Sequence, residues 1–238
     1  MRELISAEWR MLRRNAVVLS SAVFLPIFFA VALYLLRDTL GDPGTVFATQ
    51  SVTIAVVGLY MAGTTTLAAR RRSQYLKRML SLGVGPTTVL IGVLGLLVLL
   101  TTLQIVSAAI FLGLVSSPPV APLVVVAGLV LLLSFLTGAA ILTASLTKSA
   151  EHAQITTMPL FLVLFGIAVW TALFVTPDTV WLSRVIPGGA LTELLTVAWN
   201  GGELATLWPS ATISLAYSVG ALALGVRGFT WDRRGATG

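Results

Sequence analysis

Charged side chains are missing from the interior of six long apolar runs in this sequence. The chain has 238 residues, of which 57% are hydrophobic and only 10% are charged, whereas about 25% are charged in soluble domains. The charged residues lie between the runs or at their ends. Because a charge at the centre of a bilayer costs at least about 2.5 kcal/mol, this distribution predicts a membrane domain and excludes an ordinary soluble fold.

Cysteine is also missing and histidine occurs once, as His152, so the sequence offers no disulfide and no cluster of metal ligands. The phosphate-binding pattern G-x-x-x-x-G-K-[S/T] is absent, because neither Lys77 nor Lys148 follows a glycine. We therefore expect no metal, no cofactor and no enzymatic activity in this chain. The net charge of +6 does not indicate nucleic-acid binding, because the basic residues cluster beside the apolar runs, where they set topology and contact anionic lipid.

The apolar runs predict an all-α integral membrane protein that forms a single domain over residues 1–238. Each run exceeds the about 17–20 residues that a helix needs to cross the hydrocarbon core. The six predicted spans are residues 16–36, 47–69, 87–115, 121–147, 155–175 and 208–227. Between the third and fourth spans, Ser116-Ser117-Pro118-Pro119 is typical of a tight connection.

The basic residues fall almost entirely on one side of these spans. If the N-terminus is cytoplasmic, only Arg37 and Arg184 lie on the opposite side. The positive-inside rule therefore predicts a multi-pass membrane protein with both termini in the cytoplasm. We expect it to lie in the plasma (inner) membrane. The two halves show no sequence repeat, which favours a pathway between subunits over one built from inverted repeats within one chain.

Two segments outside the spans have helical periodicity and a basic polar face. Residues 1–15 predict a helix that lies in the membrane interface before the first span. Residues 70–82 predict a second amphipathic helix on the cytoplasmic side, ended by Gly83. Each helix places one charge, Glu8 or Arg72, on its apolar face. We hypothesise that Glu8 and Arg72 pair where the helices pack; the alternative is that each side chain reaches water alone.

The longest segment between spans, residues 176–207, is apolar rather than polar. It predicts two short outer helices, too short to cross the membrane, that dip in and return or lie at the surface. The segment contains two tryptophans, Trp181 and Trp199, and Trp208 follows it. All three suit an aromatic belt at the membrane interface. Two interpretations stay open, a structural cap on the bundle and an outer gate. The gate residues would be Trp181, Pro187, Gly188, Gly189 and Glu193.

Uncharged polar residues inside the spans are candidates for contacts with a bound molecule. Such side chains suit an apolar or amphipathic ligand, although hydrogen bonding between helices is their commoner use in membranes. The candidates are Gln50, Thr53, Thr64, Thr65, Gln104 and Ser107.

The order of all these segments resembles the type-2 permease family of ATP-binding-cassette exporters. Two stretches carry the resemblance locally: residues 71–80, RRSQYLKRML, between the second and third spans, and residues 185–194, VIPGGALTEL, before the last span. The chain departs from the family at Arg70-Arg71-Arg72, where the family often has an acidic residue.

The resemblance implies the transmembrane subunit of a small exporter of drugs, antibiotics or lipids. It implies a second permease copy, identical or related, with the pathway between the copies. It also implies two copies of a cassette-type ATPase, which hold the ATP and Mg. Segment 70–82 would contact the ATPase through Arg71, Arg72, Tyr75, Leu76, Lys77, Arg78, Met79 and Leu80.

Three other classes of membrane protein provide alternatives. An ion-coupled carrier or channel needs charged or strongly polar groups at mid-membrane, and the sequence supplies none. An intramembrane enzyme needs partners for its histidine, but Ser145 and Ser149 lie near His152 at no diagnostic spacing, so we interpret His152 as a solvated loop residue. A non-transporting module, such as a sensor or immunity subunit, is compatible with the sequence.

Overall fold

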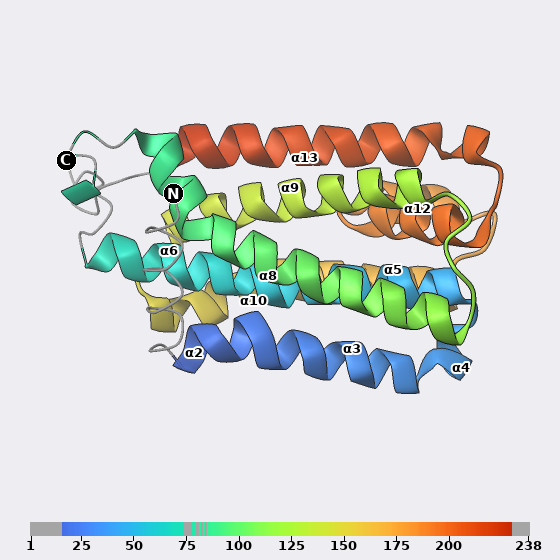
Figure 1. Cartoon of the computed structure of the whole chain (residues 1–238). Helices are drawn as coiled ribbons and strands as arrows, with labels where there is room; N and C mark the ends of the chain where they lie inside the picture. The colour runs from blue at the N-terminus through green and yellow to red at the C-terminus, as the bar shows by residue number, and fades with distance from the viewer. Residues whose placement is uncertain (1–15, 74–77, 80, 82, 84, 230–238) are drawn as a thin grey trace.

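A computed structural model of the chain describes residues 16–73, 78–79, 81, 83 and 85–229, and these form helices and connections without a strand. The long helices lie side by side in one bundle (Figure 1). Helices α6 (Ala62–Arg72) and α13 (Trp208–Gly228) both end at one end of the bundle (Figure 1). We call it the basic end, because Arg72, Lys148 and Arg227 stand at or next to helix ends there. We call the opposite end, where α5 (Pro43–Ala55) and α13 begin, the acidic end, because Asp42 and Glu203 precede those helices.

The helices follow one another in the order that the apolar runs predict. Their bounds are α2 Ala16–Leu19, η1 Ser20–Phe24, α3 Leu25–Leu35, α4 Arg37–Leu40, α5 Pro43–Ala55, η2 Val56–Met61, α6 Ala62–Arg72, α8 Pro86–Val115, α9 Pro122–Leu146, α10 Ala150–Leu173, α11 Val180–Val185, α12 Gly189–Asn200, η3 Leu204–Leu207 and α13 Trp208–Gly228. Both η1 and η2 are π-helical, and η3 is a 3-10 helix.

Five helices are long and apolar enough to cross a membrane, and they correspond to the second through sixth predicted spans. The first predicted span, 16–36, corresponds to α2, η1 and α3, whose apolar part, Ser20–Leu35, is shorter than the other five. Six crossings therefore stay a prediction. The predicted interfacial helix, residues 1–15, lies outside the described residues.

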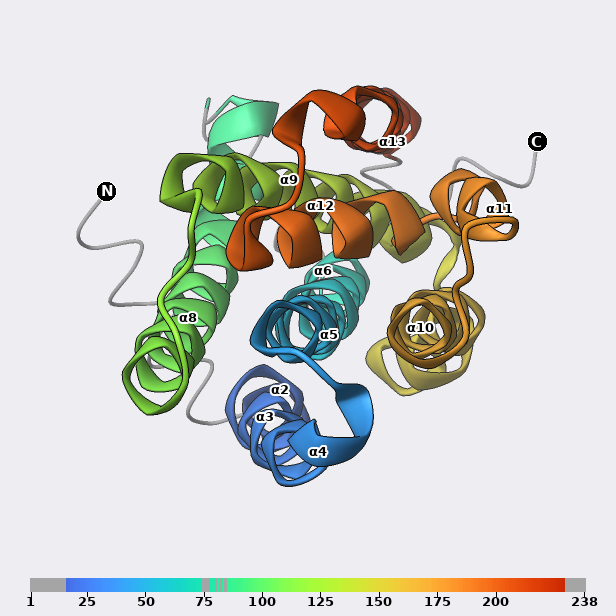
Figure 2. The same ribbon diagram turned by 90° about the vertical axis from the view of Figure 1, so that its right-hand side faces the viewer.

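The helix formed by α5, η2 and α6 occupies the centre of the bundle, with α3, α8, α9, α10 and α12 around it (Figure 2). Its most apolar stretch is 83% buried although its mean hydropathy, 1.6, is below the 2.6 of α8 and α9. Its hydroxyls are tolerated there because several donate to carbonyls of their own helix, as Thr53 does to Thr49 and Thr66 to Ala62. Burial therefore follows position in the bundle rather than hydropathy.

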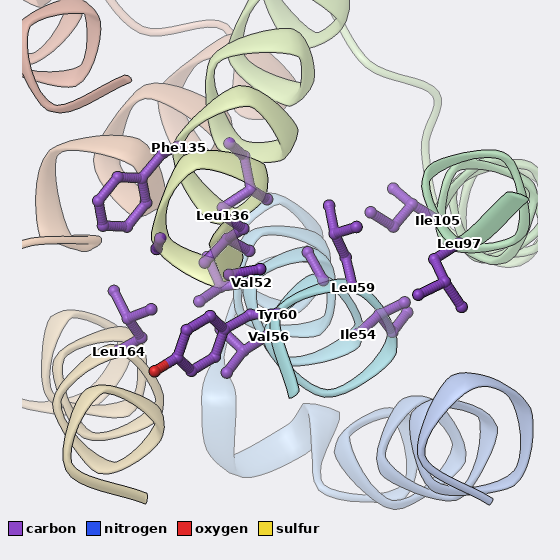
Figure 3. Close-up of a cluster of buried hydrophobic side chains, with 14 of the residues drawn as sticks. Val52, Ile54, Val56, Leu59, Tyr60, Leu97, Ile105, Phe135, Leu136 and Leu164 are labelled. Carbon is purple, nitrogen blue, oxygen red and sulfur yellow. The ribbon is translucent and has the colours of Figure 1, made fainter. Parts of the chain in front are cut away.

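Apolar side chains from the central helix fill the space toward its neighbours. In Figure 3, Leu59 and Tyr60 of η2 lie among Ile105 of α8, Leu136 of α9 and Leu164 of α10. All five side chains are at most 1% exposed. This core ties three of the outer helices to the central one.

Helices α9 and α13 pack with their backbones in close contact. A Cβ on Gly138 would lie 2.3 Å from the carbonyl carbon of Ala221, and a Cβ on Gly225 would lie 2.5 Å from the carbonyl oxygen of Gly138. Glycine at both positions lets the helices approach as small residues do in membranes. The contact fixes the last span against the fourth.

At the acidic end, α12 runs across the bundle rather than along it (Figure 2). Eight of its residues are buried, and it packs on α5 and α9. The predicted tight connection at Ser116–Pro119 leads into Val120 and Ala121, whose N–H groups donate to the carbonyls of Trp199 and Ala198. Because the last carbonyls of a helix have no partner within it, this connection caps α12.

Candidate functional site

A cleft of about 660 Å³ lies between α3, α5 and α8. Its wall is almost entirely apolar, and the polar side chains in it are uncharged. The lining residues are Val23, Pro26, Ile27, Ala30, Val31, Tyr34, Gln50, Ile54, Leu100, Leu103, Gln104, Ser107, Ala108 and Phe111. A volume in the range of about 300–1,000 Å³ with a few polar groups is typical of a small-molecule site.

Gln104 donates a hydrogen bond to the helix that forms the opposite wall of this cleft. Pro26 has no N–H, so the carbonyl of Ala22, four residues earlier, loses its usual helical donor. Nε2 of Gln104 donates to that carbonyl at 3.1 Å. The other amide atom, Oε1 of Gln104, is buried without a partner in the described part of the chain. The side chain of Gln104 therefore links α8 to η1 through its Nε2, while its Oε1 accepts no hydrogen bond from the described residues.

The six polar residues that the sequence singles out divide into two groups. Three of them, Gln50, Gln104 and Ser107, lie together in the cleft. Gln50 is 4% exposed, and its Nε2 donates to the carbonyl of Ala30 at 2.7 Å. Ser107 donates to Leu103 of its own helix at 2.7 Å. The cleft thus has amide groups from two different helices.

The threonines lie elsewhere. Thr53 is fully buried and bonds within its helix, while Thr64 donates to the carbonyl of Ala140 of α9 at 3.5 Å. Thr65 donates to Met61 and lines a second cleft of about 400 Å³, beside η1 and α10. For Thr53 and Thr64, hydrogen bonding inside the bundle accounts for the hydroxyl.

At the basic end, Arg71 turns toward the bundle. Its Nη1 donates to the carbonyl oxygens of Ala144 at 2.5 Å and Ser145 at 3.0 Å, in the last turn of α9. Its guanidinium also lies 5.7 Å from the ring centre of Phe229. A cation that donates to the last carbonyls of a helix stabilises that end. Arg71 is thus the C-terminal cap of α9.

Arg72 faces outward, and its described ionic partner is Glu151 at the start of α10, with Nη1 and Oε2 3.3 Å apart. Both side chains are more than half exposed, so the pair links α6 to α10 only weakly. The hypothesised partner, Glu8, lies outside the described residues. Nearby, His152 is exposed in the first turn of α10 rather than in a loop, and its Nδ1 lies 3.0 Å from Oγ of Ser149.

Only part of the predicted helix 70–82 can be followed. Residues 70–72 are the last turn of α6 rather than the start of a separate helix. Arg78 is exposed, whereas Met79 is half-buried against the hydrophobic core. Four of the predicted contacts lie outside the described residues, namely Tyr75, Leu76, Lys77 and Leu80.

At the acidic end, Pro187-Gly188-Gly189 forms the predicted break between α11 and α12. Gly188 has a φ of 96°, which favours glycine. A Cβ on Gly189 would lie 1.9 Å from the carbonyl oxygen of Ser183. The two glycines are therefore what lets α11 fold back onto the start of α12.

An ion pair closes this turn. The Arg184 guanidinium donates to both carboxylate oxygens of Glu193, from Nε at 2.7 Å and from Nη2 at 2.5 Å. Oγ of Ser210 of α13 donates to the same carboxylate at 2.7 Å. The hydrogen bonds with Glu193, together with its charge, raise the pKa of Arg184 against the effect of burial. Glu193 thus joins α11, α12 and α13.

The aromatic belt prediction is wrong for one of its three tryptophans. Trp181 and Trp208 are 61% and 69% exposed, but Trp199 is 1% exposed. Its ring packs 4.4 Å from that of Phe47, and its Nε1 donates to the carbonyl of Ser117 at 3.1 Å. Because α12 enters the bundle, its tryptophan serves as a core residue. The choice between a structural cap and an outer gate stays open.

Sequence reasoning missed the aromatic mouth of the cleft and the junction at Asn200. Tyr34 and Phe111 meet edge to face at 5.0 Å between ring centres. Oδ1 of Asn200 accepts from the N–H of Gly44 at 2.9 Å, and its Nδ2 donates to Asp42. For the contact between Gln104 and Ala22, by contrast, Pro26 inside the first apolar run was an available signal, because a proline there leaves a carbonyl that needs another donor.

The spanning segments of the described helices carry charged side chains only at their ends. Within the described part of the chain, no group of three His, Cys, Asp or Glu residues could hold a metal ion.

The chain matches the model of a known protein family. The model of a family described as ABC-2 family transporter protein matches residues 44–227, more than half of the chain. A search of curated proteins found no match.

Proposed function

The chain belongs to the ABC-2 transporter family, and we propose that it is the transmembrane subunit of an exporter driven by separate ATPase subunits. Membership in this family implies pairing with an ATP-binding-cassette subunit. The finer part of the proposal is that the cargo is apolar or amphipathic, such as a drug, an antibiotic or a lipid. It leaves the cell across the plasma membrane, and two permease copies form the complete membrane unit.

The family match is the observation that carries the proposal, and the cleft between α3, α5 and α8 supports the type of cargo. Its wall offers apolar side chains and the uncharged Gln50, Gln104 and Ser107. Such a wall suits a molecule that partitions into lipid and makes few hydrogen bonds. The absence of charge from the interior of the described spans disfavours coupling to an ion gradient.

Within this proposal, the ATPase binds at the basic end. Arg72 and Arg78 are exposed there, and the connection between α9 and α10 lies beside Arg72. The sequence assigned Arg71 and Met79 to the same contact with the ATPase, but both side chains contact the bundle. They therefore lie beneath the proposed docking surface rather than in it. The proposed docking surface is therefore narrower than segment 70–82 as a whole.

The first test is purification of the tagged chain from its native membrane in mild detergent, with intact-mass analysis of the complex. We expect a cassette-type ATPase at a 1:1 ratio to the permease. A homogeneous complex without any nucleotide-binding protein would contradict the proposal and favour a channel or a sensor module.

Charge reversal tests the docking surface itself. The double variant Arg72→Glu/Arg78→Glu should reduce the ATPase that copurifies by about tenfold, because both side chains would repel the partner that they now attract. Arg227→Glu is the matched control, since Arg227 is exposed at the same end on α13. Equal loss in the control would show a general effect of charge rather than docking.

A further inference from the structure

The mouth of the cleft at the acidic end has a positive charge. Tyr34 and Phe111 are its lining residues nearest that end, and the Arg37 guanidinium lies 4.6 Å above the ring of Tyr34. Arg37 is the first residue of α4, just after the end of α3, and it lies beside the lining residue Tyr34 without lining the cleft itself. The side chain therefore stands where an apolar wall gives way to water.

Arg37 retains donors for an anion. Its contact with Asp38 is 3.7 Å, to Nε alone, and Asp38 is 87% exposed. One Nη1 bond, at 3.4 Å, goes to the carbonyl of Tyr34. The other described arginine at this end, Arg184, is held by both oxygens of Glu193. Of the two, Arg37 is thus the guanidinium available to a molecule in the cleft.

The length of the cleft matches one leaflet of a bilayer. On α3 and η1 the lining extends from Val23 to Tyr34, and at 1.5 Å per residue this is about 16 Å. Half of a hydrocarbon core is about 15 Å. At the deep end lies Gln104. An alkyl chain of one leaflet's length fits between the arginine at the mouth and the amide at depth.

We propose that this cleft binds the exported substrate, and that the substrate is a single-chain amphiphile with an anionic headgroup. The alkyl chain lies between α3 and α8, and the headgroup contacts Arg37. Calling the bound molecule a substrate rests on the proposed export function. It places a binding site within one permease chain rather than between two copies.

Photolabelling of the permease with its ATPase in lipid nanodiscs tests the assignment. The probe is a long-chain fatty acid with a diazirine in its alkyl chain, and the labelled peptides are identified by mass spectrometry. We expect labelling on α3 and α8 that excess unlabelled fatty acid suppresses. Addition of ATP should reduce it, because transport empties the site.

Two variants test the chain and headgroup parts separately. Ala108→Phe fills the cleft and should reduce labelling about tenfold, whereas Ala216→Phe, on the exposed face of α13, should not change it. Arg37→Gln should weaken labelling by the acid about tenfold while leaving labelling by the corresponding diazirine alcohol unchanged. Arg37 is exposed, so this variant tests the site even if Ala108→Phe fails to fold.

Several results would overturn the assignment. Labelling spread evenly over α3, α8 and α13 would show ordinary annular lipid. Labelling that Arg37→Gln leaves unchanged would remove the headgroup contact. Labelling that ATP does not alter would show a resident lipid instead of a substrate. In each case copurification of the ATPase is a separate readout, so the proposed function can stand while this inference fails.

Discussion

Replacing Arg71 by glutamine is expected to destabilise the protein, whereas the same replacement at Arg72 leaves stability almost unchanged. The two side chains are adjacent and have the same charge, but they have different surroundings. Arg71 donates to two carbonyls in the last turn of α9. Arg72 contacts Glu151 at 3.3 Å, and the two side chains are 60% and 73% exposed.

The magnitude follows from these contacts. A hydrogen bond from a charged donor contributes about 1.5–3 kcal/mol, and a cation at a helix C-terminus adds about 0.3–1 kcal/mol. Glutamine keeps one shorter donor, so we expect a loss of about 1.5–3 kcal/mol for Arg71→Gln. An exposed ion pair contributes at most about 1 kcal/mol, which sets the limit for Arg72→Gln.

Thermal unfolding of the purified chain in detergent, followed by tryptophan fluorescence, measures the difference. For a domain of this size, the expected fall in Tm is about 3–12 °C for Arg71→Gln and under about 4 °C for Arg72→Gln. Arg71→Lys should lie between Arg71→Gln and the unaltered chain, because lysine keeps the charge and one donor. Equal shifts at the two arginines would refute the capping role.

Three further replacements have expected outcomes in the same unfolding assay. Gly138→Ala should lower stability by about 1–3 kcal/mol because its Cβ meets the backbone of α13. Gly220→Ala has nothing within 4 Å of its Cβ and should raise stability by up to about 1 kcal/mol. A stability change of the same sign at both sites would contradict the close contact between α9 and α13. Trp199→Phe should cost about 1 kcal/mol for the lost hydrogen bond and Trp199→Ala about 3–5 kcal/mol for the cavity, and equal costs would show that the ring does not pack in the core. Glu193→Gln should lower stability by about 1–3 kcal/mol because Arg184 loses a charged partner at a site where both side chains are mostly buried. An unchanged Tm would show that the ion pair does not stabilise the packing of α11 on α12.

Much of the fold was predictable because lipid constrains a sequence so strongly. The five long helices, the break at Pro187-Gly188-Gly189 and the helices on either side of it all follow from apolar length and from glycine and proline. The path of α12 across the bundle was not predictable. Its entry into the core depends on the approach of Gly44 to Asn200 and on Trp199 packing against Phe47, which are contacts between distant segments.

The candidate site was predictable in composition but not in arrangement. Polarity within apolar runs singled out Gln50, Gln104 and Ser107, which share one cleft, but it equally singled out Thr53 and Thr64, which bond inside the bundle. A single sequence cannot separate the groups, because helical periodicity gives the face of a side chain and not the neighbour that meets it. For the same reason, the sequence assigned Arg71 and Arg72 to one role, contact with the ATPase, although Arg71 bonds to α9 and Arg72 faces outward.

The central helix connects the proposed docking surface to the cleft. It runs without interruption from Pro43 to Arg72, so its basic end carries Arg72 while Gln50 and Ile54 of the same helix line the cleft. Between them lies the π-helical segment η2, Val56–Met61, which packs beside the π-helical η1 and α8. π-helical turns are common sites of helix kinks, and they are frequent at functional sites. We infer that a displacement of α6 by the ATPase reaches the cleft through η2, because the helix continues without a break to Gln50 and Ile54 and because Leu59 and Tyr60 of η2 are buried against the neighbouring helices.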